Sequence, residues 1–382
     1  MTEAATRAER RTAKSTPSPS ERGFRMPAEW EPHEATWIAW PHNRTDWPGK
    51  LAAVQWVYGE IVRKVAPGET VRILARSAEE SARVRRLLRR IGLGLDRIEL
   101  FRVPTDRSWT RDCGPLFVRR DGATPRVPPA VSILRFRFNA WARYDDWRKD
   151  DRVPLHVAKA LDMDLLPVKL NGRDIVLEGG SIEVNGRGTL VTTEECLLDT
   201  ETQVRNPGLG RQDYEAIFRD NLGVKNVLWL GAGIAGDDTH GHVDDVCRFV
   251  GPRTVVLCHE RNTQDVNYRA LAENRERMER MRLEDGGKLE IVPLPLPAPL
   301  SFEGRRLPAS YANFYIANAA VLVPTFNDPN DRVALGILSE LFGDRPVVGI
   351  HAVDLVWGLG TLHCLTQQQP ATSGSPPSVR RK

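Results

Sequence analysis

The chain has few cysteines and no long apolar run. Its 382 residues include five cysteines, none of them in a CxxC pair, so the sequence does not predict a disulfide framework. A reducing compartment, the cytoplasm, is therefore the expected location. The apolar runs are far shorter than the roughly 20 residues that a membrane-spanning helix needs, and we expect no association with a membrane.

Basic charge is also scarce in the part of the chain that is expected to fold. The net charge is +4, but residues 1–25 and 371–382 contribute +3 each, which leaves −2 for the body between them. Because a nucleic-acid-binding domain carries its basic charge on the folded surface, this distribution argues against a nucleic-acid partner. A mildly acidic body is compatible with a cationic small-molecule ligand.

The two ends have the composition of disordered segments. Residues 1–25 are rich in Ala, Arg, Thr, Ser and Pro without apolar periodicity, and residues 371–382 form a second, basic tail. The pair Arg10-Arg11 is typical of a twin-arginine export signal, but no apolar stretch follows it here. Because no low-complexity linker or fixed-period repeat interrupts residues 26–370, we expect a single domain there.

Short apolar runs alternate with amphipathic ones in residues 26–370, which predicts an α/β or α+β fold. Strands are expected at Thr36–Trp40, Val71–Ala75, Ile98–Val103, Pro115–Val118, Ile175–Glu178, Ser181–Val184, Gly188–Thr192, Val227–Leu230, Thr254–Cys258, Leu289–Val292, Ala319–Pro324 and Val347–His351. Helices are expected at Leu51–Val65, Ala78–Ile91, Gln212–Asn221, Asp265–Arg282 and Asp331–Phe342.

Two of four polar segments at expected strand ends carry carboxylates. In the first, Trp109–Pro115, Asp112 follows Arg111. A surface ion pair is the simplest interpretation, but an aromatic wall beside a fixed carboxylate suits a flat cation. In the second, Glu178 precedes two glycines, which allow a positive-φ turn or a close backbone approach. A hairpin bulge with an exposed Glu178 is the alternative, and a phosphate loop is excluded because the GxxxxGK[ST] pattern is absent.

The other two segments carry histidine and cysteine. On an extended segment His242 and Asp244 would point to the same side, so both could enter one pocket. The spacing of His240, His242 and Asp244 also suits zinc, which is the main alternative. Cys364 is flanked by glycines and polar residues, and such a cysteine with a distant histidine is the signature of a nucleophile. A buried, inert Cys364 is the common alternative.

Taken together, these segments resemble the agmatine deiminase family of guanidine-modifying enzymes, which is related to the bacterial-type peptidylarginine deiminases. The resemblance covers about residues 26–370 and rests on the motifs WTRDCGP (109–115), FNAW (138–141), LEGGSIEVNG (177–186), TTEECLL (192–198), GHVD (241–244), SYANFYIAN (310–318) and HCLTQQQP (363–370). It implies a pentein fold, a five-fold pseudosymmetric α/β propeller of ββαβ-type units around a central channel. It implies neither a metal nor an organic cofactor, and it makes a homo-oligomer the expected state.

The resemblance also implies roles for individual side chains. The catalytic ones are the nucleophile Cys364, the general acid and base His242, its carboxylate partner Glu178, and the guanidinium-binding Asp112 and Asp244. The substrate-binding ones are Trp109, Asp112, Asp244 and Asp238. The expected reaction is hydrolysis of agmatine to N-carbamoylputrescine and ammonia through a thiouronium on the cysteine, a step of putrescine and polyamine biosynthesis.

The sequence departs from the family in the segments around the expected substrate. The family's GGGN run is Gly358-Leu359-Gly360-Thr361 here, so we expect a reshaped loop. The acidic run before His242 is changed to Asp238-Thr239-His240, and Ala142 follows FNAW where a glycine is common. Arginine or peptidylarginine is therefore the alternative substrate, and Arg143 near the channel mouth would favour it. A zinc hydrolase and a non-catalytic guanidinium-binding protein are the remaining alternatives.

Overall fold

The computed structural model describes residues 17–122, 124 and 127–372. Most of the disordered arm and tail expected at the two ends lies outside these residues. Residues 17–25 differ from that expectation, because Phe24 is buried and the backbone N–H of Arg25 donates to the carbonyl oxygen of Arg119 at 2.9 Å. The packed aromatic ring anchors the beginning of the described chain to the strand that carries Arg119.

The strands form five sheets that share one pattern within the described residues. The first sheet has four strands: β20 (Thr366–Pro370), β1 (His33–Ala39), β2 (Thr70–Ala75) and β3 (Ile98–Arg102). The second contains β4 (Leu116–Arg120), β5 (Ala130–Arg135) and β6 (Leu165–Pro167), and the third contains β9 (Glu183–Val184), β10 (Thr189–Thr193) and β11 (Asn226–Leu230). The fourth contains β12 (Cys247–Phe249), β13 (Thr254–His259) and β14 (Glu290–Pro295), and the fifth contains β17 (Tyr315–Ile316), β18 (Val321–Thr325) and β19 (Val347–His351). In each sheet a central strand pairs antiparallel with one neighbour and parallel with the next. Short hairpins join β7 (Lys169–Leu170) to β8 (Arg173–Asp174) and β15 (Ser301–Phe302) to β16 (Arg305–Arg306).

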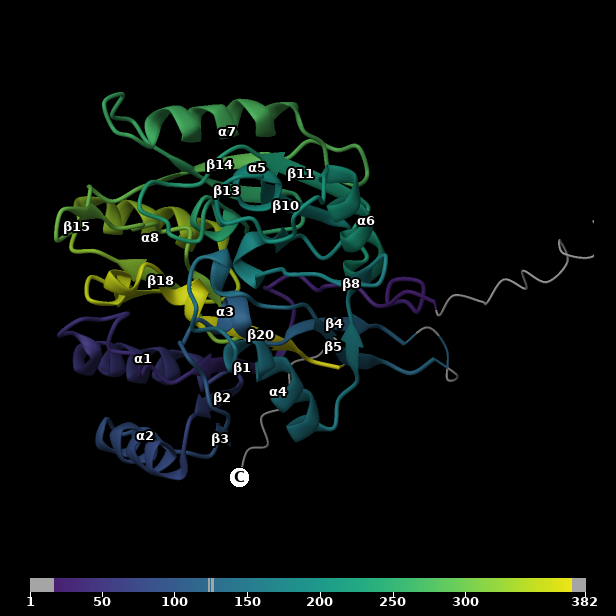
Figure 1. Ribbon diagram of the computed structural model, residues 1–382. Coiled ribbons are helices and arrows are strands. Elements are labelled where there is room, and N and C mark those ends of the chain that lie inside the picture. The colour runs from purple at the N-terminus through teal and green to yellow at the C-terminus, as the bar shows by residue number, and fades with distance from the viewer. Residues whose placement is uncertain (1–16, 123, 125–126, 373–382) are drawn as a thin grey trace, which may run out of the picture.

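A helical connection joins the central strand of each sheet to its parallel neighbour, as a parallel pair requires. The connecting helices are α1 (Leu51–Val65), α4 (Val153–Leu161), α5 (Glu194–Leu198) with α6 (Arg211–Leu222), α7 (Tyr268–Arg280) and α8 (Pro329–Leu341), while α2 (Ala78–Arg90) connects β2 to β3. The longer helices lie at the periphery of the molecule (Figure 1). The repeated ββαβ unit confirms the pentein architecture and narrows the expected fold class to α/β.

Side-chain caps mark the start of two peripheral helices, α8 and α2. At the start of α8, Asp328 accepts a hydrogen bond from the backbone N–H of Asn330 at 2.8 Å, and Asp331 reaches back to the N–H of Asp328 at 3.1 Å. The hydroxyl of Ser77 accepts from the backbone N–H of Glu80 at 3.2 Å at the start of α2. These bonds satisfy N–H groups that have no partner inside the helix.

Each peripheral helix buries one face. In α1, Val54, Tyr58, Ile61 and Val65 are buried at the three- and four-residue spacing of a single helix face. Burial of one such side chain contributes about 1.5–3 kcal/mol, so this face holds the helix against its sheet. No helix in the described ranges is both long enough and apolar enough to cross a membrane.

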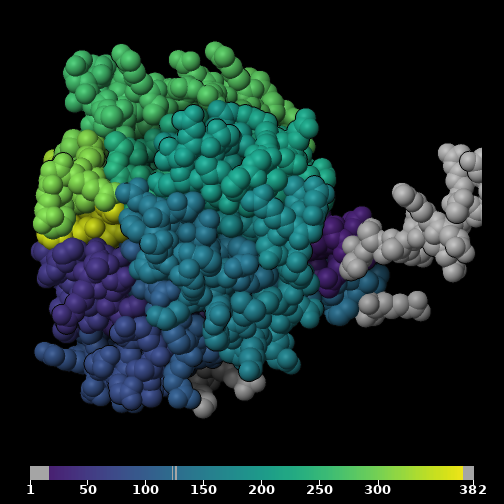
Figure 2. Space-filling view, viewed as in Figure 1, coloured from purple at the N-terminus to yellow at the C-terminus, as the bar shows by residue number. Residues whose placement is uncertain are grey.

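The N-terminal and C-terminal strands of the described chain lie in the same sheet. β20 pairs antiparallel with β1, and the N-terminal and C-terminal parts of the surface adjoin in Figure 2. The side chain of Gln369 strengthens this contact, since its Oε1 accepts from Nε1 of Trp37 at 3.0 Å and from Nη1 of Arg72 at 2.6 Å. The pairing of β20 with β1 therefore builds one of the five ββαβ units from both ends of the described chain.

Candidate active site

A cavity of about 450 Å³ collects the side chains that the sequence singled out. Its wall includes Cys364, Asp112, Trp109, Trp141, Asp238 and Asp46. His242, Asp244 and Glu178 lie next to this wall and are at most 1% exposed. The residues expected to form the site are therefore brought together, although they come from four separate segments of the chain.

Single helical turns present most of these side chains. Asp112 lies in α3 (Thr110–Cys113), Cys364 in α9 (Leu362–Leu365) and Asp244 in η4 (Val243–Asp245), while Glu178 directly precedes η3 (Gly179–Ser181). The strand expected at Ile175–Glu178 is reduced to one bridge between Val176 and Arg137.

The extended backbone expected for His242 and Asp244 is wrong, because a 3-10 turn begins directly after His242. The turn nevertheless keeps the two side chains together, with His242 Nδ1 4.0 Å from Asp244 Oδ1.

Gly180 allows the backbone to approach the site closely. Its N–H donates to Oδ1 of Asp112 at 3.0 Å. A Cβ atom at this position would lie 2.5 Å from Nδ1 of His242 and 2.9 Å from Oδ1 of Asp112, both far inside van der Waals contact. Any side chain here would push the histidine and the carboxylate apart. Of the two roles predicted for this glycine pair, a positive-φ turn or a close backbone approach, Gly180 therefore serves the second.

Asp112 is held in a fixed orientation by two donors. Besides the N–H of Gly180, the indole Nε1 of Trp141 donates to its Oδ2 at 3.0 Å. Burial raises the pKa of Asp112 to about 6; the charge of His242 opposes this shift, and the charge of Asp244 adds to it. The neighbouring Arg111 does not pair with Asp112 as the simplest reading of the sequence predicted. Instead it binds Glu29, with Nη2 3.1 Å from Oε2.

Asp244 and Cys364 lie side by side. The Oδ2 of Asp244 is 3.8 Å from the sulfur of Cys364, and Nδ2 of Asn313 donates to that sulfur at 3.1 Å. Oδ1 of Asp244 is buried and has no hydrogen-bond partner among the described residues. Burial raises the pKa of the Cys364 thiol well above its ordinary value, and the charge of Asp244 adds to the shift. The thiol therefore needs additional positive charge before it ionises near neutral pH.

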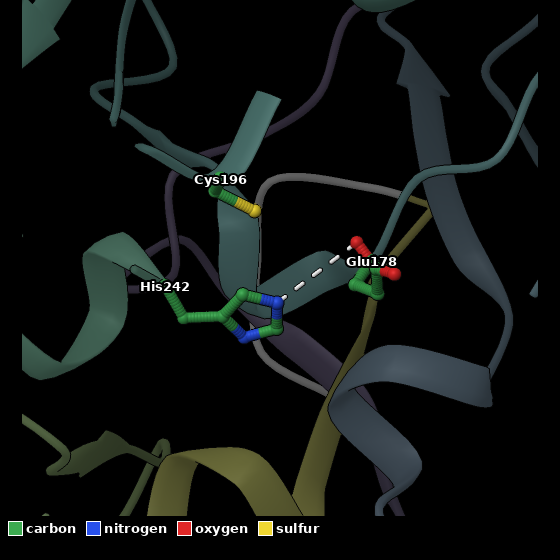
Figure 3. Close-up of side chains that lie close together, drawn as sticks. All are labelled: Glu178, Cys196 and His242. Carbon is green, nitrogen blue, oxygen red and sulfur yellow. Dashed lines mark ion pairs between the residues drawn. The ribbon is translucent and has the colours of Figure 1, made fainter. Parts of the chain in front are cut away.

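His242 lies between the carboxylates of Asp112 and Glu178, and Figure 3 shows its contact with Glu178. Its Nδ1 is 3.8 Å from Oδ1 of Asp112 and its Nε2 is 3.9 Å from Oε2 of Glu178. Although burial opposes protonation, Asp112 and Glu178 hold the pKa of His242 well above its ordinary value. Burial likewise opposes ionisation of Glu178, but the guanidinium of Arg205, with Nε 3.2 Å from Oε1, lowers the pKa of that carboxyl to about 2. The histidine is thus a cation held by two acids.

Cys196 lies in α5, within the connection from β10 to β11, and forms a cluster with Glu178 and His242 (Figure 3). One potential ligand atom from each residue lies within 4.8 Å of the others, a spacing that a metal ion could use. The electrostatics disfavour a cation there, because Arg205 already binds Glu178 and a ligating His242 would first have to lose its proton.

The alternative zinc site of His240, His242 and Asp244 is not assembled among the described residues. Nε2 of His240 is 2.7 Å from Oδ2 of Asp199, and its Nδ1 is 3.6 Å from Oε1 of Glu195. These contacts hold the His240 ring in a carboxylate pair of its own, so the HxHxD spacing does not translate into shared ligands.

Four polar side chains form a connected network elsewhere on the cavity wall. Nη1 of Arg107 donates to Oδ1 of Asp46 at 2.5 Å, and its Cζ lies 4.2 Å from the ring centre of Tyr144. The hydroxyl of Tyr144 donates to Oδ2 of Asp238 at 2.5 Å. Oδ2 of Asp46 is buried and, within the described ranges, accepts no hydrogen bond. Burial raises the pKa of Asp46 to about 7 against the opposing charge of Arg107.

Leu359 contributes to the same wall from the loop before Cys364. Its backbone adopts the left-handed region, with φ 70° and ψ 24°, at a cost of roughly 1–2 kcal/mol for a residue with a side chain. The chain thus accepts strain at this position while it keeps a conformation that a glycine would favour. The leucine in the altered run Gly358-Leu359-Gly360-Thr361 is thus accommodated by backbone strain at Leu359.

Several side chains that hold the site were not predicted. Arg205, Asn313, Glu29, Cys196 and Asp46 each contact or adjoin a predicted site residue. Asn313 lies inside the recognised motif at 310–318, so that motif was the available signal for it. Cys196 likewise lies inside the recognised motif at 192–198, whereas Arg205, Glu29 and Asp46 have no local pattern that distinguishes them from ordinary polar residues.

Comparison with known proteins gives consistent matches over nearly the whole chain. Residues 25–370 match the model of a family described as Porphyromonas-type peptidyl-arginine deiminase. The agmatine deiminase of Ectopseudomonas mendocina is 35% identical, and the alignment covers 94% of this chain and 99% of that protein. The agmatine deiminase structure from Enterococcus faecalis is similar with a TM-score of 0.83 and 32% identity, over 94% of this chain and 99% of the other. A Cys-to-Ser variant of the C. jejuni agmatine deiminase with substrate bound has a TM-score of 0.79 and 28% identity, over 91% and 96% of the two chains.

Proposed function

Because the chain belongs to the Porphyromonas-type peptidyl-arginine deiminase family, we propose that it hydrolyses agmatine to N-carbamoylputrescine and ammonia with Cys364 as nucleophile. The observation that carries the proposal is the position of the thiol between carboxylates. Cys364 lies on the cavity wall beside Asp112 and 3.8 Å from Oδ2 of Asp244, with the His242 cation next to both acids. Such a site suits a planar cation that is attacked by sulfur.

Asp112 and Asp244 hold the guanidinium of the substrate. Asp112 is oriented by Trp141 and Gly180, and Oδ1 of Asp244 has no partner in the described structure. Carboxylates bind a guanidinium through forked, charge-assisted hydrogen bonds that fix its plane. The arriving cation also lowers the pKa of Asp112 from about 6, so that the carboxylate is ionised when substrate is bound.

The substrate's own charge activates the thiol. Burial and Asp244 keep Cys364 protonated in the free enzyme, and a guanidinium placed beside the sulfur favours the thiolate, with release of the thiol proton to solvent. The N–H of Asn313, 3.1 Å from the sulfur, supplies one further donor to the anion. The thiolate therefore forms when a substrate is present, which limits reaction of the buried thiol with other electrophiles.

His242 transfers the protons. The Cys364 thiolate attacks the guanidinium carbon, and the imidazolium donates a proton to the nitrogen as the C–N bond breaks and ammonia leaves. The neutral imidazole then removes a proton from the water that attacks the S-alkylthiouronium. The C–S bond breaks, the ureido product departs and the sulfur is restored. Glu178, kept ionised by Arg205, stabilises the imidazolium form.

The carboxylate oxygen of Asp46 that has no partner in the described ranges favours an amine at the other end of the substrate. Asp238 and Asp46 both line the cavity, and Oδ2 of Asp46 still lacks a donor among the described groups. Two arginines line the cavity too: Asp46 and Asp146 bind the guanidinium of Arg107, and Arg305 is an exposed second cation on this wall. Arg143, which would have favoured arginine, is exposed, bonds to Gln203 and is not part of the cavity wall. Trp109 packs its ring at the same wall.

Ammonia release from agmatine, free arginine and a blocked arginine peptide tests the proposal, with Cys364→Ser as control. We expect turnover of agmatine that is lost in the variant and is unaffected by a chelator. Turnover of arginine or the peptide instead would keep the mechanism and reject the substrate. Chelator-sensitive turnover would indicate a metal hydrolase, and binding of agmatine without turnover would indicate a non-catalytic protein.

The resemblance also predicts self-association and a cytoplasmic location. Light scattering of the purified protein tests the first prediction, since a homo-oligomer has a multiple of the 42.9 kDa chain mass. Fractionation of the source cells tests the second.

A further inference from the structure

His363, the residue before the thiol, lies between two buried carboxylates. Its Nδ1 is 2.6 Å from Oδ2 of Asp244, and its Nε2 is 2.8 Å from Oε2 of Glu29. All three side chains are at most 4% exposed. The mechanism proposed above uses Asp244 but assigns nothing to His363 or Glu29.

Glu29 is surrounded by donors. Its Oε1 accepts from Nη2 of Arg248 at 2.9 Å and from the backbone N–H of Ile316 at 2.8 Å, and its Oε2 accepts from Nη2 of Arg111 at 3.1 Å. Although burial opposes ionisation, Arg248 and the other nearby cations hold the pKa of Glu29 well below its ordinary range. An ionised carboxylate can only accept hydrogen bonds, so Nε2 of His363 must carry a proton.

Asp244 places the same demand on the other ring nitrogen. Its Oδ2 lies 2.6 Å from Nδ1 of His363 and also accepts from Nδ2 of Asn313 at 3.3 Å, so this oxygen acts as an acceptor toward both neighbours. With an acceptor-only oxygen at each nitrogen, the ring satisfies both contacts only when both nitrogens are protonated. The geometry therefore selects an imidazolium.

We propose that His363 is a positioning residue that, as an imidazolium fixed between Glu29 and Asp244, directs Oδ1 of Asp244 toward the substrate and offsets the charge of Asp244 beside the thiol. The inference rests on the proposed deiminase reaction. Because His363 occupies Oδ2, the remaining oxygen of Asp244, which has no partner in the described residues, is the one left for the guanidinium.

The charges that face His363 come from several elements. They are Asp244 from η4, Glu29 from the segment before β1, Arg111 from α3, Arg248 from β12, Glu183 from β9 and the adjacent thiol Cys364. Two arginines and the imidazolium oppose three carboxylates in this buried group. Loss of the imidazolium charge would leave one of the three carboxylates without a cation. We expect the uncompensated negative charge to raise the pKa of the adjacent Cys364 thiol.

Two isosteric variants separate the two contacts of the ring. The amide nitrogen of His363→Asn stands close to the position of Nδ1 and keeps a donor toward Asp244, whereas that of His363→Gln reaches the position of Nε2 and keeps a donor toward Glu29. Neither carries charge. His351→Gln, at an exposed histidine in β19, is the matched control.

Alkylation of Cys364 by iodoacetamide as a function of pH is the first measurement, with Cys364→Ser giving the background from the other four buried cysteines. We expect both His363 variants to move the alkylation midpoint upward by about one pH unit or more. The KM for agmatine should rise roughly tenfold or more in His363→Gln and less in His363→Asn, because only the latter still orients Asp244. His351→Gln should match the wild type in both measurements.

Nitrogen NMR of histidine-labelled wild-type protein is the second measurement and needs no stable variant. We expect the His363 ring to be protonated on both nitrogens at neutral pH. A neutral ring, or folded variants with unchanged alkylation midpoints, would overturn the inference. If the wild type fails to hydrolyse agmatine, the proposed function fails, while the alkylation curve and the NMR signal still decide the role of His363.

Discussion

At the scale of single residues, the protonation state of Asp46 determines how much negative charge the cavity offers to a cationic ligand. One carboxylate oxygen accepts from Arg107, and the other is buried without a partner in the part of the chain that the structure describes. Its pKa of about 7 means that the free enzyme holds this group close to half-protonated at neutral pH. A bound ammonium group would supply the missing donor and would stabilise the ionised form.

This arrangement predicts a pH-dependent affinity for agmatine. Below pH 7 Asp46 becomes protonated and loses the charge that attracts the substrate amine, so KM should rise roughly tenfold between pH 8 and pH 6. Asp46→Asn should have a high KM at every pH in that interval, with no such slope. KM measured across the interval tests the prediction, and Asp145→Asn, at an exposed position that does not contribute to the pKa shift of Asp46, should keep the wild-type slope. A slope that survives in Asp46→Asn would assign the titration to another group.

Residue type and immediate neighbours singled out Cys364, His242 and Asp112 as candidates. Each motif is weak by itself, and the common order and spacing of all the motifs along the chain is what indicated this set. Asp46 and Arg205 had no such signal. The sequence around Asp46 reads as a polar loop, and only folding removes one of its oxygens from water. Burial of a single carboxylate oxygen depends on distant segments, so it cannot be read from neighbouring letters.

At the scale of elements, a left-handed turn holds the tryptophan that orients Asp112. Ala140, Trp141 and Ala142 have φ values of 49°, 59° and 52°, and Oδ1 of Asn139 accepts from the N–H of Ala142 at 2.9 Å. Side chains make this conformation costly, by roughly 1–2 kcal/mol per residue. The turn therefore stores strain next to the site, at a place where the family commonly has a glycine after the tryptophan.

Ala142→Gly should relieve part of that strain. The side chain of Ala142 is exposed, so little packing is lost, and we expect the free energy of unfolding to increase by about 1 kcal/mol. Ala52→Gly, at an exposed position inside α1, should lower it by about the same amount because glycine there only adds flexibility to the unfolded chain. Denaturant titrations of both variants provide the comparison. Changes of the same sign would show that the positive φ of Ala142 carries no strain.

Element prediction succeeded where the hydrophobic period had room to repeat. The helix expected at Leu51–Val65 has the same bounds in the structure, and the one expected at Asp265–Arg282 is shorter at both ends, as Tyr268–Arg280. The turns η3, η4 and α9 hold the site but span only three or four residues, too few to show a 3.6-residue period. α4 and β5 were also missed, since α4 follows a polar stretch without a clear start signal.

At the scale of the whole molecule, the side chain of Gln369 on β20 holds the C-terminal strand to β1 and β2 near the beginning of the described chain. Gln369 is the acceptor for Trp37 and Arg72, two buried donors on β1 and β2. Gln369→Ala would leave both donors without this acceptor, and we expect the free energy of unfolding to fall by about 2 kcal/mol.

Thermal and denaturant unfolding measure this loss, and the turnover of folded protein at 25 °C should change little because the side chain lies outside the cavity wall. Gln264→Ala, at an exposed position, should alter stability by less than about 0.5 kcal/mol. Equal stabilities for the two variants would mean that water or a rearranged side chain satisfies the donors on β1 and β2.

The same closure explains what sequence reasoning missed around the thiol. Glu29 and His363 are more than 300 residues apart in the chain, yet their side chains are 2.8 Å apart. Their contact exists because β20 returns to β1, and the letters alone did not show that return. The resemblance supplied the catalytic set one residue at a time, whereas the charges that hold this set in place depend on how the chain closes.

The pairing of β1 with β20 has a consequence for the protein during its synthesis. A ribosome releases β1 long before β20, so the nascent chain carries an unpaired strand edge, which is a template for wrong pairing, until translation reaches residues 366–370. Cys364 emerges only two residues before that strand. A translation product that ends before residue 364 has an open sheet and lacks Cys364, the proposed nucleophile, so we expect such chains to aggregate readily and to leave guanidines unreacted.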